Sequence, residues 1–188
     1  MGKISDFQHI YCLFCRTGAE YRICENIRKK FPDVYPLAAT QEKHRIVNKH
    51  DEIDRRVFLP GYLFLYSKEK VDFDSLLKMD DIYRVLGDED TAHELQDSDR
   101  SFAEWLLRNN GLIGISRITN RNNKITIKSG PMKYFAKKLV KLDKHTKNAL
   151  VRMDFLGATR DMWLAFEFDD EEVRRPVRPA KKDPKKKK

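Results

Sequence analysis

Short apolar runs and amphipathic stretches alternate along the first hundred residues of the chain. The run at residues 10–15 is short and apolar, which is typical of a buried strand. Ile23, Ile27 and Phe31 recur every four residues, which predicts an amphipathic helix over residues 18–31. The same patterns predict further strands over residues 34–39, 44–47, 57–66 and 82–86. They predict further helices over residues 73–79 and from Ser98 onward. This order predicts an α+β domain in which helices cover one face of an antiparallel sheet.

Two local signals refine this pattern. Residues 17–20 (Thr-Gly-Ala-Glu) fit a capping box, in which a Thr hydroxyl and a Glu carboxylate satisfy free amides at a helix start. Residues 51–56 mix acids and bases and are interpreted as a charged loop.

The pattern changes after residue 110. Residues 111–123 mix Gly, Ser, Thr, Asn and Arg without a periodic stretch, which predicts a flexible linker. Residues 124–168 contain short alternating segments separated by turn signals, which predicts four or five strands and a small β-barrel. The spacing of Leu139, Leu142 and Met153 also fits a helix, but the turn signal between them favours strands. The expected regions are residues 1–110, a linker at 111–123, a barrel at 124–170 and a basic tail at 171–188.

One ten-residue run, VFLPGYLFLY at residues 57–66, is interrupted only by Pro60-Gly61. Proline removes a donor from a strand ladder, so within a strand it belongs at an edge or a bulge, and the adjacent glycine permits an unusual backbone there. The run therefore predicts a kinked edge strand flanked by aromatic residues, which suits an apolar docking surface.

Charge is strongly segregated along a chain whose net charge is +9. Residues 174–188 carry nine bases and one acid, a composition that predicts disorder. Residues 69–104 carry twelve acids against four bases, whereas residues 117–152 carry eleven bases against one acid. The basic segment fits either a solvated surface or a stripe that contacts nucleic-acid phosphates.

The composition argues against a membrane, metal or catalytic protein. No apolar run approaches the length of a bilayer span, and the first residues lack a signal-peptide pattern. The odd number of cysteines (Cys12, Cys15 and Cys24) argues against a disulfide framework and predicts a reducing, cytoplasmic location. The Cys12-x-x-Cys15 pair lies in a strand-like run, and no second Cys/His pair supports a zinc site. The histidines are scattered and no Gly-rich phosphate loop is present, so no catalytic residue, metal or cofactor is expected.

Two separated segments resemble one protein family. Residues 11–20 (YCLFCRTGAE) and 55–65 (RRVFLPGYLFL) resemble the N-terminal domain of NusG-type transcription elongation factors. Residues 124–168 look like the SH3-like KOW barrel that follows this domain in the family. The sequence around residues 16–20 is closer to a specialised paralogue such as LoaP than to housekeeping NusG. The chain departs from the family at Leu59, where Phe is usual.

The resemblance implies a monomeric, non-catalytic regulator that binds RNA polymerase. In the family, the N-terminal domain docks an apolar face on the clamp helices of the largest polymerase subunit, which promotes processive elongation and antitermination. Carried over position by position, the polymerase-binding residues are Tyr11, Phe14, Arg16, Phe58, Leu59 and Tyr62. Strand alternation requires about half of each run to face the core instead.

The basic segments are the candidates for contact with nascent RNA or upstream DNA. The predicted nucleic-acid-binding residues are Lys43, Arg45, Arg55, Arg56, Arg117, Arg121, Lys124, Lys128 and Lys133. Acidic neighbours of the first four also fit a solvated charged loop. In the barrel, the family's partner-binding loop corresponds to Phe155 and Leu156, where relatives meet Rho or a small-subunit ribosomal protein. The alternative function is a stand-alone RNA-binding or ribosome-associated KOW module.

Overall fold

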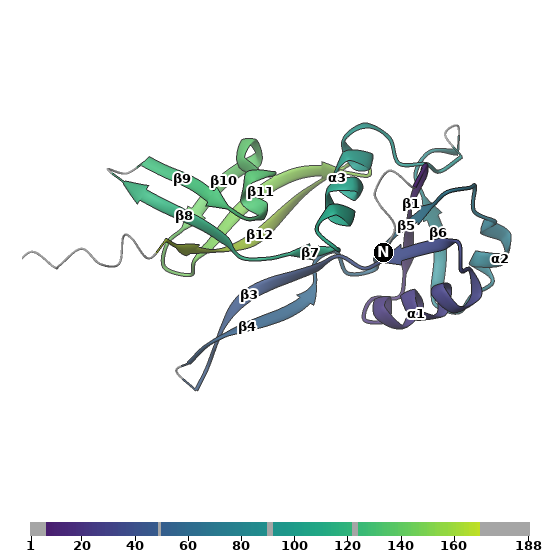
Figure 1. Cartoon of the computed structure of the whole chain (residues 1–188), viewed down its shortest axis with the longest axis horizontal. Helices are drawn as coiled ribbons and strands as arrows, with labels where there is room; N and C mark the ends of the chain where they lie inside the picture. Colours follow the sequence, from purple (N-terminus) through teal and green to yellow (C-terminus); the bar gives the residue numbers. More distant parts are fainter. Residues whose placement is uncertain (1–6, 49, 90–91, 122–123, 170–188) are drawn as a thin grey trace, which may run out of the picture.

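A four-stranded antiparallel sheet forms the centre of the N-terminal half (Figure 1). The computed structural model describes residues 7–48, 50–89, 92–121 and 124–169. In sheet order, the strands are β2 (Val34–Leu37), β5 (Tyr62–Ser67), β1 (His9–Cys15) and β6 (Ile82–Leu86). The central strands β1 and β5 are covered on both faces, which explains their nearly continuous apolar sequences.

Helices cover both faces of this sheet, whereas the sequence predicted helices on one face only. Within the described residues the α-helices are α1 (Glu20–Lys30), α2 (Phe73–Leu77) and α3 (Asp97–Arg108). Helices α1 and α2 share a core with Tyr11, Leu13 and Leu65. Helix α3 belongs to a second core that contains Ile10 and Phe64. Alternate residues of each central strand therefore enter different cores, and the result is an α+β domain.

A protruding hairpin forms the segment after β2. Its strands, β3 (Thr40–Val47) and β4 (His50–Val57), pair in antiparallel fashion, and β3 also pairs in parallel with the short β7 (Leu112–Ile113). The interpretation of residues 51–56 as a loop was wrong. Polar side chains lie on both faces of this hairpin, so its strands lack the apolar alternation by which a strand is recognised.

The C-terminal half forms a five-stranded sheet of order β10-β11-β12-β8-β9. Its strands are β8 (Ser116–Arg121), β9 (Lys124–Ser129), β10 (Leu139–Asp143), β11 (Asn148–Phe155) and β12 (Ala158–Phe168). Two 3-10 turns, Pro131–Lys133 and Ala136–Lys138, connect β9 to β10. The segment with ambiguous spacing is β-structure, as its turn signal predicted. The predicted tail at 171–188 lies outside the described residues.

The structure differs from the sequence-based prediction at the linker of residues 111–123, where β7 and β8 lie. Ile113 and Ile118 are buried, and β8 pairs in parallel with the end of β12. These two isoleucines are separated by polar residues, and their pairing partners lie far away in the sequence. Local composition therefore missed both strands.

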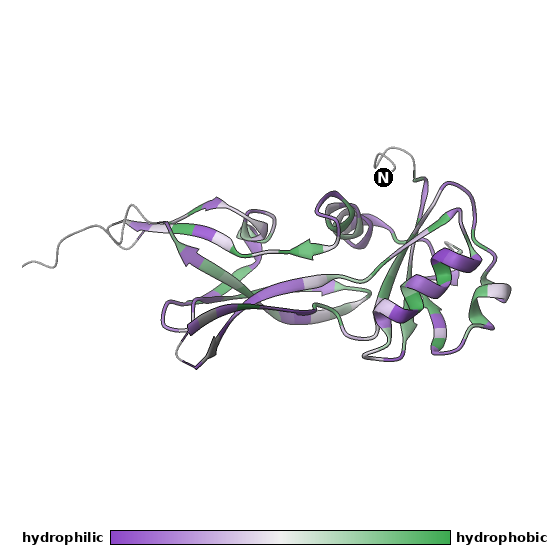
Figure 2. Ribbon diagram, turned by 60° about the horizontal axis from the view of Figure 1, so that its bottom comes forward, coloured by the Kyte–Doolittle hydropathy of each residue, from purple (hydrophilic) through white to green (hydrophobic). Residues whose placement is uncertain are grey.

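Helix α3 joins the two halves. In Figure 1 it lies between the four-stranded sheet and the C-terminal sheet. Trp105 of α3 stacks on Tyr134 with ring centroids 4.7 Å apart. Phe102 of α3 packs edge-on against Phe155 of β11, with ring centroids 5.6 Å apart. Figure 2 shows hydrophobic positions along the strands of the N-terminal sheet and mixed hydropathy on α1. One apolar core therefore continues from the N-terminal sheet into the C-terminal sheet.

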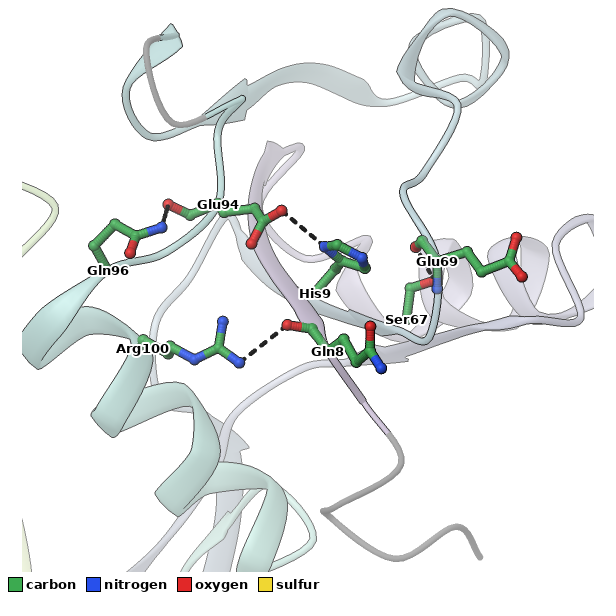
Figure 3. A network of polar contacts seen from close by, with 7 residues as sticks. All are labelled: Gln8, His9, Ser67, Glu69, Glu94, Gln96 and Arg100. Carbon is green, nitrogen blue, oxygen red and sulfur yellow. Dashed lines mark hydrogen bonds and ion pairs between the residues drawn. The ribbon is translucent and has the colours of Figure 1, made fainter.

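Polar contacts fix the connection between β6 and α3 against the start of β1 (Figure 3). His9 Nδ1 lies 2.7 Å from Glu94 Oε1, and Arg100 Nη2 donates to the carbonyl of Gln8 at 3.0 Å. The Leu95 amide donates to the Ile10 carbonyl at 2.9 Å. Within the described part of the chain, no helix is long and apolar enough to cross a membrane.

Candidate functional site

The Pro60-Gly61 dipeptide forms a tight turn between β4 and β5. The Tyr62 amide donates to the Leu59 carbonyl at 3.1 Å, and Gly61 has φ +83°, as expected for the glycine of a type II turn. The predicted single strand over residues 57–66, kinked at an edge, was therefore wrong. Proline and glycine connect two different sheets here, and β5 is a central strand.

A buried carboxylate holds this turn in place. Glu20 is 1% exposed, and its Oε1 accepts a hydrogen bond from the Gly61 amide at 2.8 Å. The predicted capping box at residues 17–20 was wrong, because α1 starts after Ala19 without a side-chain cap. The Cys15 amide also donates to the Gly61 carbonyl at 2.8 Å. These contacts fix the turn against the end of β1.

An aromatic face lies beside the turn. Phe14 of β1 pairs with Tyr62 of β5, and their ring centroids are 5.8 Å apart. Both side chains are partly exposed. Tyr83 of β6 lies 5.8 Å from Phe14, and the Arg84 guanidinium lies 5.5 Å from the Phe14 ring centroid. We call Phe14, Tyr62, Tyr83 and Arg84 the aromatic face. Sequence analysis did not single out Tyr83 and Arg84. The short strand that contains them has the pattern of any half-buried strand, and this pattern does not distinguish a binding side chain from an ordinary exposed one.

The other predicted polymerase-binding residues occupy different environments. Tyr11 is 1% exposed on the opposite side of the sheet, where its ring contacts Phe73 edge-on at 4.9 Å. Phe58 and Leu59 are buried in the core that joins the two halves. Arg16 is 66% exposed, and its Nη1 lies 3.6 Å from Asp81 Oδ1. The structure thus brings Phe14 and Tyr62 together but does not bring Tyr11 to them.

The predicted partner-binding residues of the C-terminal half contact the N-terminal half. Phe155 is buried, with its ring centroid 6.2 Å from that of Tyr62. The Leu156 amide donates to Asp99 Oδ2 at 3.0 Å. Arg160 Nη2 donates to the Tyr62 hydroxyl at 2.6 Å, and its guanidinium lies 5.0 Å from the same ring. We call these contacts the seam, and they cover one side of the aromatic face.

Comparison with protein families identifies the N-terminal half. The family described as "Transcription termination factor nusG" matches residues 8–102, just over half of the chain, from β1 into α3. The chain belongs to the NusG family. This family consists of transcription termination and elongation factors that act with RNA polymerase and are not enzymes. No curated protein matches the chain.

In this NusG-family protein, the basic residues of the β3–β4 hairpin lie among acids. Arg55 donates through Nε and Nη2 to Glu42 Oε1 at 3.0 and 2.8 Å, and Arg56 pairs with Asp54. Burial lowers the pKa of Lys43, which lies in the same hairpin. Arg45 is exposed. The charges of Arg55 and Arg56 are therefore balanced by neighbouring carboxylates.

The basic residues of the C-terminal half are more open. Lys124 and Lys128 are exposed on β9, an edge strand, and Arg117 is exposed on the neighbouring β8. Lys133 is exposed in the following 3-10 turn. Arg121 lies in β8, but its side chain lies outside the described part. Lysines on an edge strand also prevent edge-to-edge pairing with another sheet. The position of these lysines therefore fits both contact with nucleic-acid phosphates and protection of the sheet edge.

The three cysteines are buried, and their burial disfavours the thiolate form. Burial raises the pKa of Cys15 to about 12 and that of Cys24 to about 11, and it raises the pKa of Cys12 as well. A thiol is a nucleophile or metal ligand only as the thiolate. Among the described residues, no three His, Cys, Asp or Glu side chains are grouped so that they could hold a metal ion.

Proposed function

We propose that this protein regulates transcription elongation by docking its aromatic face on RNA polymerase and promoting processive elongation and antitermination. The observation that carries the proposal is the position of Phe14 and Tyr62: both are partly exposed within the family-matched region. The expected contact is with the clamp helices of the largest subunit.

The chemistry of the aromatic face suits a helical partner. Tyrosine and arginine are enriched among residues that dominate binding energy, because they combine large contact area with polar ends. A helix docks on such a face through apolar anchors spaced along one side. The aromatic face offers three rings in a row (Tyr62, Phe14 and Tyr83) with a guanidinium beside them.

The proposal assigns nucleic-acid contact to the open basic residues of β8 and β9. Lys124, Lys128 and Lys133 have no ion pair within the described part of the chain, so their charge is free to meet phosphates of nascent RNA or upstream DNA. Such contacts bind with little sequence preference. In contrast, the hairpin residues Arg55 and Arg56 already have carboxylate partners.

We further assign the C-terminal sheet as a KOW-like module that recruits another protein, such as Rho or a small-subunit ribosomal protein, as in a specialised paralogue. Phe155 and Leu156 would carry that contact. Because both residues lie in the seam, recruitment through them requires the C-terminal sheet to move away from the N-terminal half.

The experiment measures binding of the full chain to purified core RNA polymerase, together with readthrough at a terminator in vitro. Phe14→Ala is the test variant, and Leu77→Ala is the control, because Leu77 is exposed on α2 across the sheet. We expect Phe14→Ala to weaken binding at least about tenfold, the size of a typical anchor residue, and to abolish readthrough. A folded wild-type protein that binds RNA but not polymerase would instead support the stand-alone RNA-binding module.

A further inference from the structure

Two aromatic rings form the outer layer of the cluster between α3 and the 3-10 turns. Trp105 of α3 and Tyr134 are stacked on each other and partly exposed. Both rings contact Phe102 and Phe135, which are fully buried. The centroids of the three rings around Trp105 lie only 5.0 to 6.3 Å from one another, so these rings share one side of Trp105. The exposed area of Trp105 therefore faces away from the cluster, where another flat ring can stack on it.

Basic side chains lie beside this pair. Arg108 comes three residues after Trp105 on α3, which places the two side chains on neighbouring positions of the helix surface. Burial raises the pKa of Tyr134, and the nearby charge of Arg108 opposes this shift. Lys133 and Lys137 are exposed in the 3-10 turns on either side of Tyr134 in the sequence. Neither lysine has an ion pair within the described part of the chain.

The acids of this region lie mainly at the other end of α3. Asp97 and Asp99 are in its first turn, six or more residues before Trp105. Glu104 is next to Trp105, and it pairs with Arg100 at 3.1 Å and with Arg108 at 3.8 Å. At the end of α3 and in the 3-10 turns, three bases therefore accompany one shared carboxylate. The partly exposed rings are thus surrounded by a surplus of positive charge.

We propose that Trp105 and Tyr134 form a stacking site for single-stranded RNA, with phosphates held by Arg108, Lys133 and Lys137. Stacking of a base on an aromatic side chain needs an unpaired base and has little sequence preference. Nascent RNA offers unpaired bases, whereas the bases of duplex upstream DNA are already stacked on one another. The inference rests on the nucleic-acid contact in the proposed function and adds a base-binding site to its phosphate contacts.

The other tryptophan of the chain provides a matched control. Trp163 of β12 is 37% exposed, and within the described residues it stacks on no other ring. The chain contains two tryptophans, so Trp163→Phe leaves Trp105 as the single indole, and Trp105→Phe leaves Trp163. The fluorescence of each single-tryptophan protein then reports on one site.

The test titrates the full chain and its variants with oligo(U), a single-stranded RNA. We expect oligo(U) to quench the fluorescence of Trp105 in the Trp163→Phe protein and to leave that of Trp163 in the Trp105→Phe protein unchanged. Trp105→Ala should weaken binding about fivefold or more, and Trp163→Ala should bind within about twofold of wild type. Replacing Lys133 and Lys137 by Gln should make the slope of log affinity against log salt less steep by about 1.4.

Two competing ligands test the stacking and the identity of the strand. Duplex RNA of the same length has no unpaired base and should not quench Trp105; equal quenching by the duplex would overturn the stacking site. Tighter binding of oligo(dT) than of oligo(U) would assign the site to single-stranded DNA and overturn the assignment to RNA.

The remaining outcomes separate this inference from the function on which it rests. If the full chain binds oligo(U) but Trp105→Ala binds equally well and Trp105 is not quenched, the stacking site is wrong and the phosphate contacts of β8 and β9 stand. If the folded full chain does not bind oligo(U), both nucleic-acid assignments are wrong, and polymerase docking is unaffected. Thermal unfolding shows whether Trp105→Ala has lost its fold. In that case the two folded single-tryptophan proteins decide, and equal quenching of both, or of neither, overturns the site.

Discussion

At the scale of single residues, Glu20 connects two distant parts of the chain. Its carboxylate accepts from the Gly61 amide, and a Cβ on Gly61 would lie 3.2 Å from the Phe14 ring. Glu20 therefore positions the turn that packs against the aromatic face. A local pattern had assigned this carboxylate to a capping box, because sequence spacing cannot reveal a partner far along the chain.

Replacing Glu20 tests this role. Glu20→Ala leaves the Gly61 amide without its acceptor in a buried site, so we expect the free energy of unfolding to fall by about 1–3 kcal/mol. Glu20→Gln keeps a carbonyl oxygen and should lose less. Urea unfolding of the full chain measures both values. Equal stability of Glu20→Ala and wild type would show that the turn does not depend on this hydrogen bond.

At the scale of elements, strands with one or two apolar faces were predictable and polar strands were not. The positions of β1, β6 and α1 follow from apolar runs or four-residue spacing, and the structure confirms them within a few residues. Strands β4 and β8 could not be found in this way. Strand β4 pairs with β3, and β8 pairs with the end of β12. The sequences of β4 and β8 contain no local pattern that indicates these partners.

The edge strand β9 carries the prediction at this scale. The affinity for single-stranded RNA falls as salt rises, and each phosphate contact makes this dependence steeper. If Lys124 and Lys128 each contact one phosphate, replacing both by Gln should make the slope of log affinity against log salt less steep by about 1.4. Lys29→Gln with Lys30→Gln on α1 is the matched control, because these lysines are also exposed. Filter binding at several salt concentrations gives the slopes. An unchanged slope would leave prevention of edge pairing as the role of these lysines.

At the scale of the whole molecule, the seam joins the two halves through aromatic and polar contacts. The aromatic face could be anticipated in part, since Phe14 and Tyr62 were named from their motifs. Its partial cover by Phe155 and Arg160 could not, because it depends on how the C-terminal sheet packs on α3. Periodicity within either half carries no information about that packing.

The seam contains a carboxylate whose titration should affect stability. Burial raises the pKa of Asp99 above its usual value, although its hydrogen bond from Leu156 and the charge of Lys138 act in the opposite direction. A carboxyl with a raised folded-state pKa contributes stability below the unfolded-state pKa and loses it as pH rises through the folded-state pKa. Ionised Asp99 is therefore unfavourable at neutral pH.

Asp99→Asn should accordingly be more stable than wild type at about pH 7, and the difference should vanish at about pH 3, where the carboxyl is protonated in both states. The amide oxygen still accepts from Leu156. Denaturant unfolding at the two pH values measures the effect, with the exposed Asp80→Asn as control. Lower stability of Asp99→Asn at neutral pH would mean that the charge itself stabilises the seam.

The most direct test of the central claim is site-specific cross-linking to polymerase. A photoreactive phenylalanine analogue placed at Phe14 of the full chain is irradiated in complex with core RNA polymerase, and the attached polymerase peptide is mapped. The same analogue placed at Tyr21, which is exposed on α1, is the control. The account predicts cross-links from position 14 to the clamp helices of the largest subunit, and none there from position 21. Absence of cross-links from position 14, or equal cross-linking from both positions, would contradict it.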